Sequence, residues 1–273
     1  MENKTLTKYR FDEKKHVHLL DEKILKGTTT VIKEVLPPPL AWYGSGMACK
    51  MLGWYDRKQG RTNYLSDEEG MPELTTRLNL IKTMTPEEYL GLLDRAYQAH
   101  DEYKKEKGDW GKETHSHIEK VVREAISVNE GQLSEKPYEN EAVERFASWG
   151  RGKKFLFSEV HVYSEKLWLG GIIDLVYEDD GIHLGDVKTG KRIYEGVFIQ
   201  DGMYDYQQEE NGFLSSEGEV LGKPVKIKGY TAINIPREGG VKEKTYYDTE
   251  RMCSFAEKLV ELHSTLTELK SFI

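Results

Sequence analysis

The chain has 273 residues, of which 38% are hydrophobic and 11% aromatic, enough for one large domain or two modest ones with a proper core. No stretch approaches the roughly 20 apolar residues that a membrane span needs, and no apolar segment follows the charged N-terminus, so we expect a cytoplasmic protein. The net charge of −8 argues mildly against a nucleic-acid partner, because phosphate binders usually present a basic face. Only two cysteines, Cys49 and Cys253, are present. We therefore expect no disulfide framework and no iron–sulfur cluster, and any metal must be held by oxygen and nitrogen.

Residues 1–108 are expected to form a mainly helical N-terminal region, interrupted by three prolines at 37–39 that no helix or central strand can contain. The sequence from Thr85 to Glu88 carries a capping signal, which predicts a helix to about Lys107 that Gly108 ends. Such a region could roof a site in the rest of the chain.

A second helix is predicted from about Gly111. Its apolar stripe has helical spacing and consists of Ile118, Val121, Val122, Ala125 and Ile126. His115 lies three residues before Ile118 on the same side, so its imidazole should point inward, whereas His117 is turned away and should be exposed. Glu119, four residues after His115, can orient that imidazole or cap the edge of the stripe.

From residue 138 onward, the pattern predicts a helix followed by a β-rich part. The predicted elements are a helix at 138–149, strands at 155–163, 167–177 and 181–188, a helix at 194–210, a strand at 225–233 and a helix from 249 to the end. Turn-length connections, among them Asp179 to Gly181, predict that the first three strands form an antiparallel meander. Residues 109–273 are therefore expected to form one α/β domain with a central mixed sheet flanked by helices.

Two aspartates, Asp174 and Asp186, lie 12 positions apart across the last predicted hairpin. Since side chains alternate along a strand, Asp186 and Lys188 share one face with Ile182 and Leu184, where charged groups are costly to bury without partners. Mg²⁺ is a suitable partner, because it takes oxygen ligands and keeps waters, one of which can attack a phosphodiester. Lys188 could orient or deprotonate that water, or stabilise charge in the transition state.

Glu159 is a third acidic candidate, in phase with Phe155, Phe157 and His161 on the preceding strand, and could bind a metal directly or through water. Each feature also has an ordinary structural explanation. An Asp-x-Lys sequence is usually a surface ion pair, and a lone histidine on an apolar face is usually a core residue. The combination of two aspartates, a lysine and the inward-pointing His115 favours the metal site.

Two further sets of residues are candidates for contacts with DNA. Gln200 and Tyr204 are four residues apart on a core-facing stripe, where they could hydrogen-bond each other or reach a phosphate. A local basic patch close to the candidate site is formed by Arg145, Arg151, Lys153 and Lys154. The patch is about as consistent with a solvated run of charges as with a DNA contact.

In this combination the sequence resembles the PD-(D/E)XK nuclease superfamily, and within it the RecB-like exonuclease branch that includes many phage exonucleases. The matching elements, in chain order, are residues 111–119 with His115, then Glu159, residues 171–174 with Asp174, residues 186–190 with Asp186 and Lys188, and residues 200–204 with Gln200 and Tyr204. The resemblance is firm over about residues 111–210.

The resemblance implies a restriction-endonuclease-like core over 109–273 and a role for each matched residue. The implied metal ligands are His115, Asp174, Asp186 and the backbone carbonyl of Val187, with Glu159 close by. Lys188 would be the catalytic lysine, acting with these carboxylates. Gln200 and Tyr204 would form the Q-x-x-x-Y motif of the branch, which helps to position DNA, and Arg151, Lys153 and Lys154 would be further DNA contacts.

The expected activity is hydrolysis of DNA phosphodiester bonds with Mg²⁺ or Mn²⁺, from strand ends, in recombination, repair or replication. No ATP-binding motif is present, so the chain would be a free-standing nuclease or a subunit that receives single-stranded DNA or duplex ends. A recombinase or a single-strand-binding protein would be a suitable partner.

An endonuclease of the same fold and a catalytically silent DNA-binding or assembly subunit are the alternatives. A silent subunit is disfavoured because every expected ligand position and the lysine are filled. A metal hydrolase that uses His115 with His117 is also disfavoured, since His-x-His on a helix points the two rings to different sides.

Overall fold

The computed structural model describes residues 8–37, 45–46, 48–49, 52, 67–190 and 192–272. Contacts within the chain divide it into two compact units, one made of Met1–Pro37 with Gly111–Ile273 and the other of Pro38–Trp110. The expected N-terminal region of residues 1–108 is therefore not one body. Its first 37 residues belong to the larger unit, which also contains every candidate site residue.

The smaller unit contains α3 (Asp67–Thr83) and the beginning of α4 (Pro86–Val128). The predicted capping box is confirmed, because the Thr85 amide donates to Glu88 Oε2 at 2.8 Å and the Glu88 amide donates to Thr85 Oγ1 at 3.3 Å. The predicted end of this helix at Gly108 is wrong, since α4 continues through Gly108 to Val128. One glycine costs a helix only about 1 kcal/mol, which its lysine- and glutamate-rich flanks can offset.

Four short strands precede the first helix of the larger unit, where a mainly helical region was expected. They are β1 (Tyr9–Asp12), β2 (Val17–Leu20), β3 (Lys23–Ile24) and β4 (Lys26–Gly27), followed by α1 (Thr28–Val35). The side chains of Tyr9, Leu20 and Leu25 form a small core together with Tyr163. Burial of these apolar side chains in a hairpin outweighs the weak helical preference of the charged residues between them.

An eight-stranded mixed sheet forms the centre of the larger unit, with the order β11-β10-β7-β6-β5-β8-β9 and β4 beside β6. Its other strands are β5 (Lys154–Ser164), β6 (Leu169–Glu178), β7 (Ile182–Lys188), β8 (Phe213–Leu214), β9 (Val220–Gly222), β10 (Ile227–Asn234) and β11 (Lys242–Tyr246). The predicted meander is confirmed, because β5, β6 and β7 pair antiparallel in sequence. Strand β10 then runs parallel to β7.

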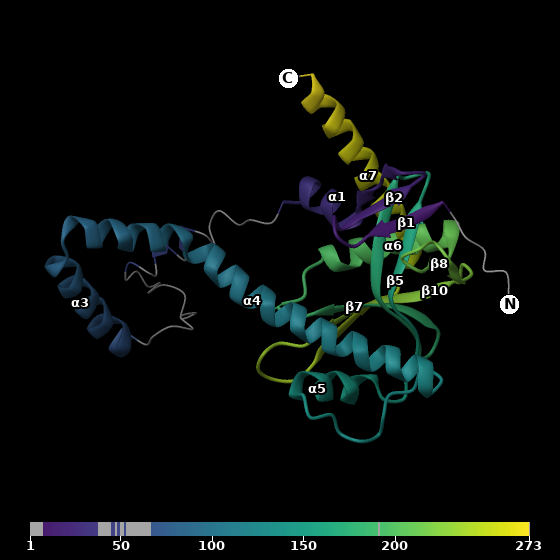
Figure 1. The fold of residues 1–273 in the computed structure, drawn as a ribbon, viewed down its shortest axis with the longest axis horizontal. Helices are drawn as coiled ribbons and strands as arrows, with labels where there is room; N and C mark the ends of the chain where they lie inside the picture. Colours follow the sequence, from purple (N-terminus) through teal and green to yellow (C-terminus); the bar gives the residue numbers. More distant parts are fainter. Residues whose placement is uncertain are drawn as a thin grey trace. The chain divides into compact units, whose positions relative to one another are not determined.

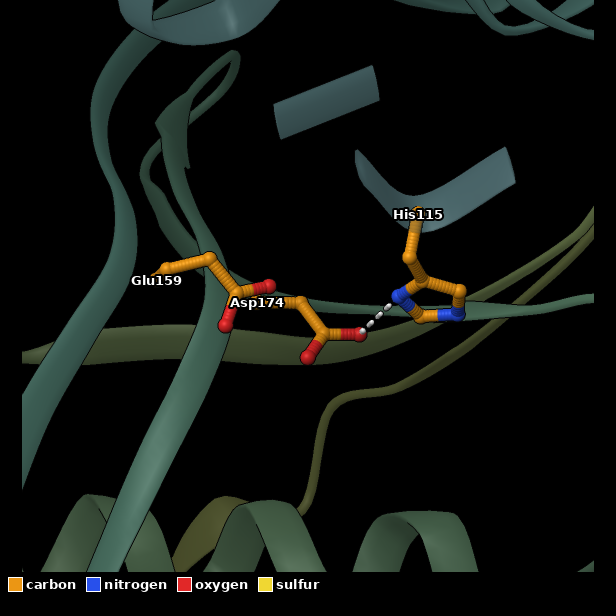
Figure 2. Close-up of side chains that lie close together, drawn as sticks. All are labelled: His115, Glu159 and Asp174. Atoms are coloured by element: carbon orange, nitrogen blue, oxygen red, sulfur yellow. Dashed lines mark ion pairs between the residues drawn. The ribbon is translucent and has the colours of Figure 1, made fainter. Parts of the chain in front are cut away.

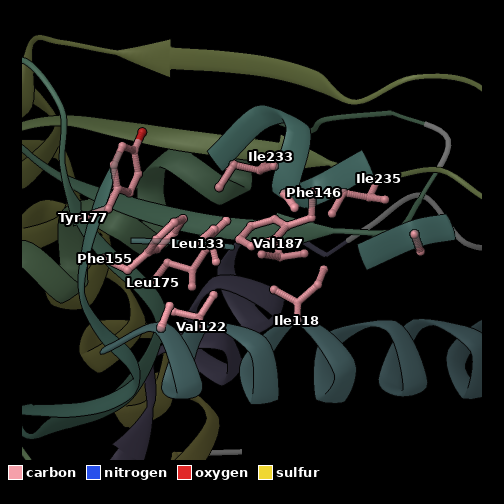
Figure 3. Packing of buried hydrophobic residues seen from close by; sticks show 13 residues of the cluster. Ile118, Val122, Leu133, Phe146, Phe155, Leu175, Tyr177, Val187, Ile233 and Ile235 are labelled. Carbon is pink, nitrogen blue, oxygen red and sulfur yellow. The ribbon is translucent and has the colours of Figure 1, made fainter. Parts of the chain in front are cut away.

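Helices cover both faces of this sheet (Figure 1). Beside the C-terminal part of α4, they are α5 (Glu141–Gly150), α6 (Gly196–Asn211) and α7 (Thr249–Ser271). Alternate residues of β7 point to opposite layers: Val187 packs with Ile118 of α4 and Phe146 of α5, as Figure 3 shows, whereas Leu184 packs with residues of α6. The expected α/β architecture with a mixed sheet flanked by helices is thus confirmed. Within the described residues, no helix has the length and apolar character needed to cross a membrane.

Candidate metal site

His115 reaches the sheet from α4. One turn before it, Gly111 is buried, and a Cβ atom there would lie 2.9 Å from Thr189 Oγ1, so a glycine lets α4 approach the end of β7 closely. The His115 side chain is 32% exposed, and its Nδ1 lies 3.8 Å from Asp174 Oδ2. The predicted inward direction of His115 is confirmed. His117 is half-buried rather than exposed, with its Nδ1 3.2 Å from Asn140 Nδ2.

Glu159 and Asp174 face each other on neighbouring strands. In the β5–β6 pairing Ser158 lies opposite Leu175 and Val160 opposite Ile173, so the register sets Glu159 opposite Asp174. Ligand atoms of His115, Glu159 and Asp174 all lie within 4.8 Å of one another (Figure 2). These three residues form a candidate metal site, which we call the metal cluster. They come from α4, β5 and β6, so only the folded chain brings them together.

The backbone of β5 is irregular around Glu159. A bulge separates Phe155 from Phe157, and Glu159 itself has a φ of 50°, a left-handed conformation that is uncommon outside glycine. The bulge takes Phe155 out of phase with Glu159, so that part of the expectation was wrong, whereas the register keeps Phe157 and His161 in phase with Glu159. Such a conformation costs energy for a residue with a side chain, so the surrounding structure must hold Glu159 in place.

Strands β6 and β7 separate at the two candidate aspartates. Their last pair is Leu175 with Gly185, and one further step of the same register would set Asp174 opposite Asp186. Instead, Asp174 Oδ2 accepts a hydrogen bond of 2.9 Å from the Val187 amide. The bond occupies the Val187 N–H and fixes the carboxylate beside β7, whereas metal binding by the Val187 carbonyl stays a prediction.

Asp186 and Lys188 form an ion pair on the α6 side of β7. Asp186 is only 2% exposed, and burial raises the pKa of its carboxyl to about 7, against the opposing effect of the Lys188 ammonium. Burial lowers the pKa of Lys188, but the nearby Asp186 and Asp174 carboxylates outweigh this and raise it above its ordinary value. Lys188 is therefore a firmly charged hydrogen-bond donor.

Glu159 is also electrostatically unusual. Burial raises the pKa of its carboxyl to about 8, and the neighbouring carboxylates of Asp174 and Glu119 add to the effect. Glu119 forms an ion pair of 2.8 Å with Arg123, and its expected role of orienting His115 or capping the stripe stays a prediction. Carboxyl groups crowded in this way favour a bound cation, which would compensate their mutual repulsion.

Tyr204 and Gln200 are brought together as predicted. Gln200 Nε2 donates a hydrogen bond of 2.7 Å to the Tyr204 hydroxyl, and Tyr204 is 4% exposed. Its ring lies where a Cβ atom at Gly171 would be, at 2.2 Å from Tyr204 Cε1. The glycine that precedes the Asp174 segment thus makes room for the tyrosine ring against β6.

Asp201 on α6 was missed by the sequence analysis. It is 1% exposed, and its Oδ2 has no hydrogen-bond partner among the described residues. Burial and the nearby Asp186 raise the pKa of its carboxyl well above the ordinary value. One feature of the sequence could have identified Asp201 as a candidate: it lies four residues after Val197 and three before Tyr204, on the same helical stripe.

The predicted basic patch is largely engaged in contacts within the chain. Arg151 pairs with Glu144 and also donates to two backbone carbonyls, and Lys153 pairs with Asp179. Arg145 likewise donates to the backbone carbonyls of residues 237 and 239. Lys154 is exposed at the start of β5. DNA contacts by Arg151, Lys153 and Lys154 stay predictions.

In comparisons with known proteins, the chain matches no protein-family model and no curated sequence.

The donor atoms of the metal cluster fit a divalent cation. One imidazole nitrogen and two carboxylates form a set of hard and borderline ligands, and the cluster includes no thiolate. Carboxylates suit Mg²⁺ and Mn²⁺, and an imidazole is compatible with transition metals. Asp186, on the next strand, is a further carboxylate that acts on Glu159 electrostatically.

Proposed function

We propose that this protein is a divalent-metal-dependent DNA nuclease with a restriction-endonuclease-like core. The observation that carries the proposal is the metal cluster of His115, Glu159 and Asp174, which lies beside the ion pair of Asp186 and Lys188. The resemblance of residues 111–210 to RecB-like exonucleases and the meander of β5, β6 and β7 support it.

The metal cluster would hold Mg²⁺ or Mn²⁺, with Asp186 as a further candidate ligand. A bound ion would polarise a phosphodiester oxygen and lower the pKa of a bound water. The hydrogen bond from the Val187 amide keeps the Asp174 carboxylate oriented toward the cluster before any ion arrives. His115, held on α4 by the packing of Ile118, supplies the nitrogen ligand.

The charge of Lys188 supports one of its two candidate roles. An ammonium whose pKa is raised by Asp186 and Asp174 is a poor base, so Lys188 Nζ would donate hydrogen bonds to a non-bridging phosphate oxygen and stabilise its developing charge. Asp186 holds the ammonium on the α6 side of β7. The hydrogen-bonded Gln200 and Tyr204 pair would support this arrangement from α6.

The decisive experiment is cleavage of end-labelled linear DNA, single-stranded and duplex, with Mg²⁺, Mn²⁺ or EDTA. We expect metal-dependent degradation by the wild type, with a loss of at least about 100-fold in rate for Lys188→Ala and Asp174→Ala. Lys166→Ala, at the exposed turn between β5 and β6, is the matched control and should retain full activity. A wild type that binds DNA but cuts nothing with either metal would favour the silent DNA-binding subunit.

A covalently closed circular substrate separates exonuclease from endonuclease. We propose exonuclease action from strand ends, which predicts that circular single-stranded and duplex DNA survive under conditions that degrade the linear forms. Cleavage of the circles at the same rate would instead assign the endonuclease of the same fold.

A further inference from the structure

A groove of about 700 Å³ in the larger unit reaches the metal cluster at Glu159. It lies between α4 and β5, with residues of β1 and of the segment 214–221 completing its walls. We call it the Glu159 groove. Its size is in the range of cavities that bind small molecules or single nucleotides.

Aromatic rings form part of the walls of the Glu159 groove. Phe11, Phe157 and His161 all line it, and the ring centres of Phe11 and His161 are 5.0 Å apart. The groove therefore presents flat apolar surfaces that suit another planar ring.

The charged residues of the Glu159 groove are mostly acidic. Glu13, Glu119 and Glu124 line it together with Glu159, whereas Arg123 is its only cation among the described residues and is paired with Glu119. This balance repels a phosphate group. The carboxylates of Glu13, Glu119 and Glu124 are acceptors for N–H groups, such as the exocyclic amino groups of nucleobases.

Ser158 gives the groove an unused polar group. Its side chain is 9% exposed, and the buried hydroxyl has no hydrogen-bond partner within the described part of the chain. Buried hydroxyl groups are nearly always hydrogen-bonded, so a partner that is absent from the folded chain itself is expected here. Ser158 also directly precedes Glu159, which joins this groove to the metal cluster.

We propose that the Glu159 groove binds an unpaired nucleobase of the DNA strand whose phosphodiester lies at the metal cluster. This inference rests on the proposed nuclease function and adds to it a base-binding groove beside the site of cleavage. The base would stack on the aromatic walls, and the Ser158 hydroxyl and the glutamate carboxylates of the groove would hydrogen-bond to the edge of the base. Guanine and cytosine carry amino groups that these acceptors can bind, so both should be preferred over thymine.

The test measures binding of free nucleosides to the full chain by saturation-transfer NMR titration in EDTA, where no cleavage occurs. We expect guanosine and cytidine to bind more tightly than thymidine, and inorganic phosphate not to compete. Ser158→Ala breaks no described hydrogen bond, so its fold should be intact, and it should weaken guanosine binding roughly three- to tenfold. Ser254→Ala, exposed on α7, is the matched control and should bind as the wild type does.

The inference would be overturned by a lack of nucleoside binding, or by equal binding of guanosine by the wild type and Ser158→Ala. Displacement of guanosine by inorganic phosphate would also overturn it, because it would show that the groove binds the phosphate groups of the DNA backbone. A cleavage assay separates this failure from failure of the nuclease proposal. An abasic nucleotide at the strand end should slow the wild type about tenfold, but should slow Ser158→Ala less. Nucleoside binding without any cleavage would keep the base site and refute the nuclease.

Discussion

At the scale of single residues, the carboxyl groups around the metal cluster bind protons unusually well. The pKa of Glu159 is raised to about 8 and that of Asp186 to about 7, in both cases mainly by burial. A carboxyl must lose its proton before it can bind a cation, so protons and metal compete at these groups. We therefore expect the apparent affinity for Mn²⁺ to rise steeply between pH 6 and pH 8.5.

Isothermal titration with Mn²⁺ at pH 6, 7 and 8.5 measures this competition. Each proton displaced by the ion contributes up to about a tenfold change in affinity per pH unit below the pKa of its carboxyl. Glu159→Gln should bind Mn²⁺ more weakly and with a shallower pH dependence. An affinity that does not change over this range would contradict metal binding by these carboxyl groups.

Asp201 leads to a prediction about stability. Its carboxyl has a folded-state pKa well above the unfolded value, so the native state binds the proton more tightly than the unfolded state does. Stability is therefore lost as the pH rises above the unfolded pKa of about 4. Asp201→Asn removes this loss, and we expect it to raise Tm by a few degrees at pH 8 and by less at pH 5.

Thermal unfolding of the two proteins at both pH values tests this prediction. Asp94→Asn, an exposed aspartate on α4, serves as the control and should leave Tm unchanged. A lower Tm for Asp201→Asn at pH 8 would mean that the charged carboxylate has a stabilising partner in the folded chain. Activity should be measured in parallel, since Asp201 lies within the electrostatic reach of Lys188.

At the scale of secondary-structure elements, the glycines differ in whether the fold leaves room for a Cβ atom. A Cβ at Gly171 would lie 2.2 Å from the Tyr204 ring, whereas one at Gly108 in α4 would meet nothing within 4 Å. Gly171→Ala should therefore displace the buried ring and destabilise the fold by about 1–3 kcal/mol, as overpacking does. Gly108→Ala is the matched control and should stabilise α4 by about 0.5–1 kcal/mol. Urea denaturation of both variants gives the two values, and equal effects would refute the packing argument.

Sequence periodicity predicted the elements that bury a regular stripe or alternate between two faces. The strands β5, β6 and β7 and the helices α5, α6 and α7 begin and end within about three residues of their expected positions, because long apolar patterns leave few alternatives. The end expected at Gly108 was wrong because a helix break depends on the flanking residues as well as on the glycine. The short strands of residues 9–27 are stable only through long-range contacts such as that of Tyr9 with Tyr163, which no local pattern contains.

The candidate site was predictable to the extent that its residues follow regular spacing. His115 lies on its helical stripe and Asp186 on its strand face as expected, since both positions follow from the repeat of the element. The direction of Glu159 depends on a bulge and a left-handed backbone, neither of which has a signal in the sequence. Asp201 was missed because its importance comes from burial against β7, which only the tertiary structure creates.

At the scale of the whole molecule, the metal cluster joins three separate elements of the larger unit. Its residues come from α4, β5 and β6, so an ion that binds them binds the folded chain and not the unfolded one. Binding then stabilises the fold by mass action, by about 2.7 kcal/mol at a free metal concentration of 100 times Kd. We expect saturating Mn²⁺ to raise Tm by roughly 5–10 °C.

Two variants distinguish metal binding from catalysis in this measurement. Asp174→Asn keeps the shape of the side chain but weakens a cluster ligand, so it should lose most of the Mn²⁺-dependent shift in Tm. Lys188→Ala is not a ligand and should keep the shift while losing cleavage. A shift that survives in Asp174→Asn would place the ion elsewhere. Loss of the shift in both variants would mean that the ion pair of Asp186 and Lys188 is required to form the metal cluster. The ends of β6 and β7, which separate at the two aspartates, would then depend on that ion pair for their geometry.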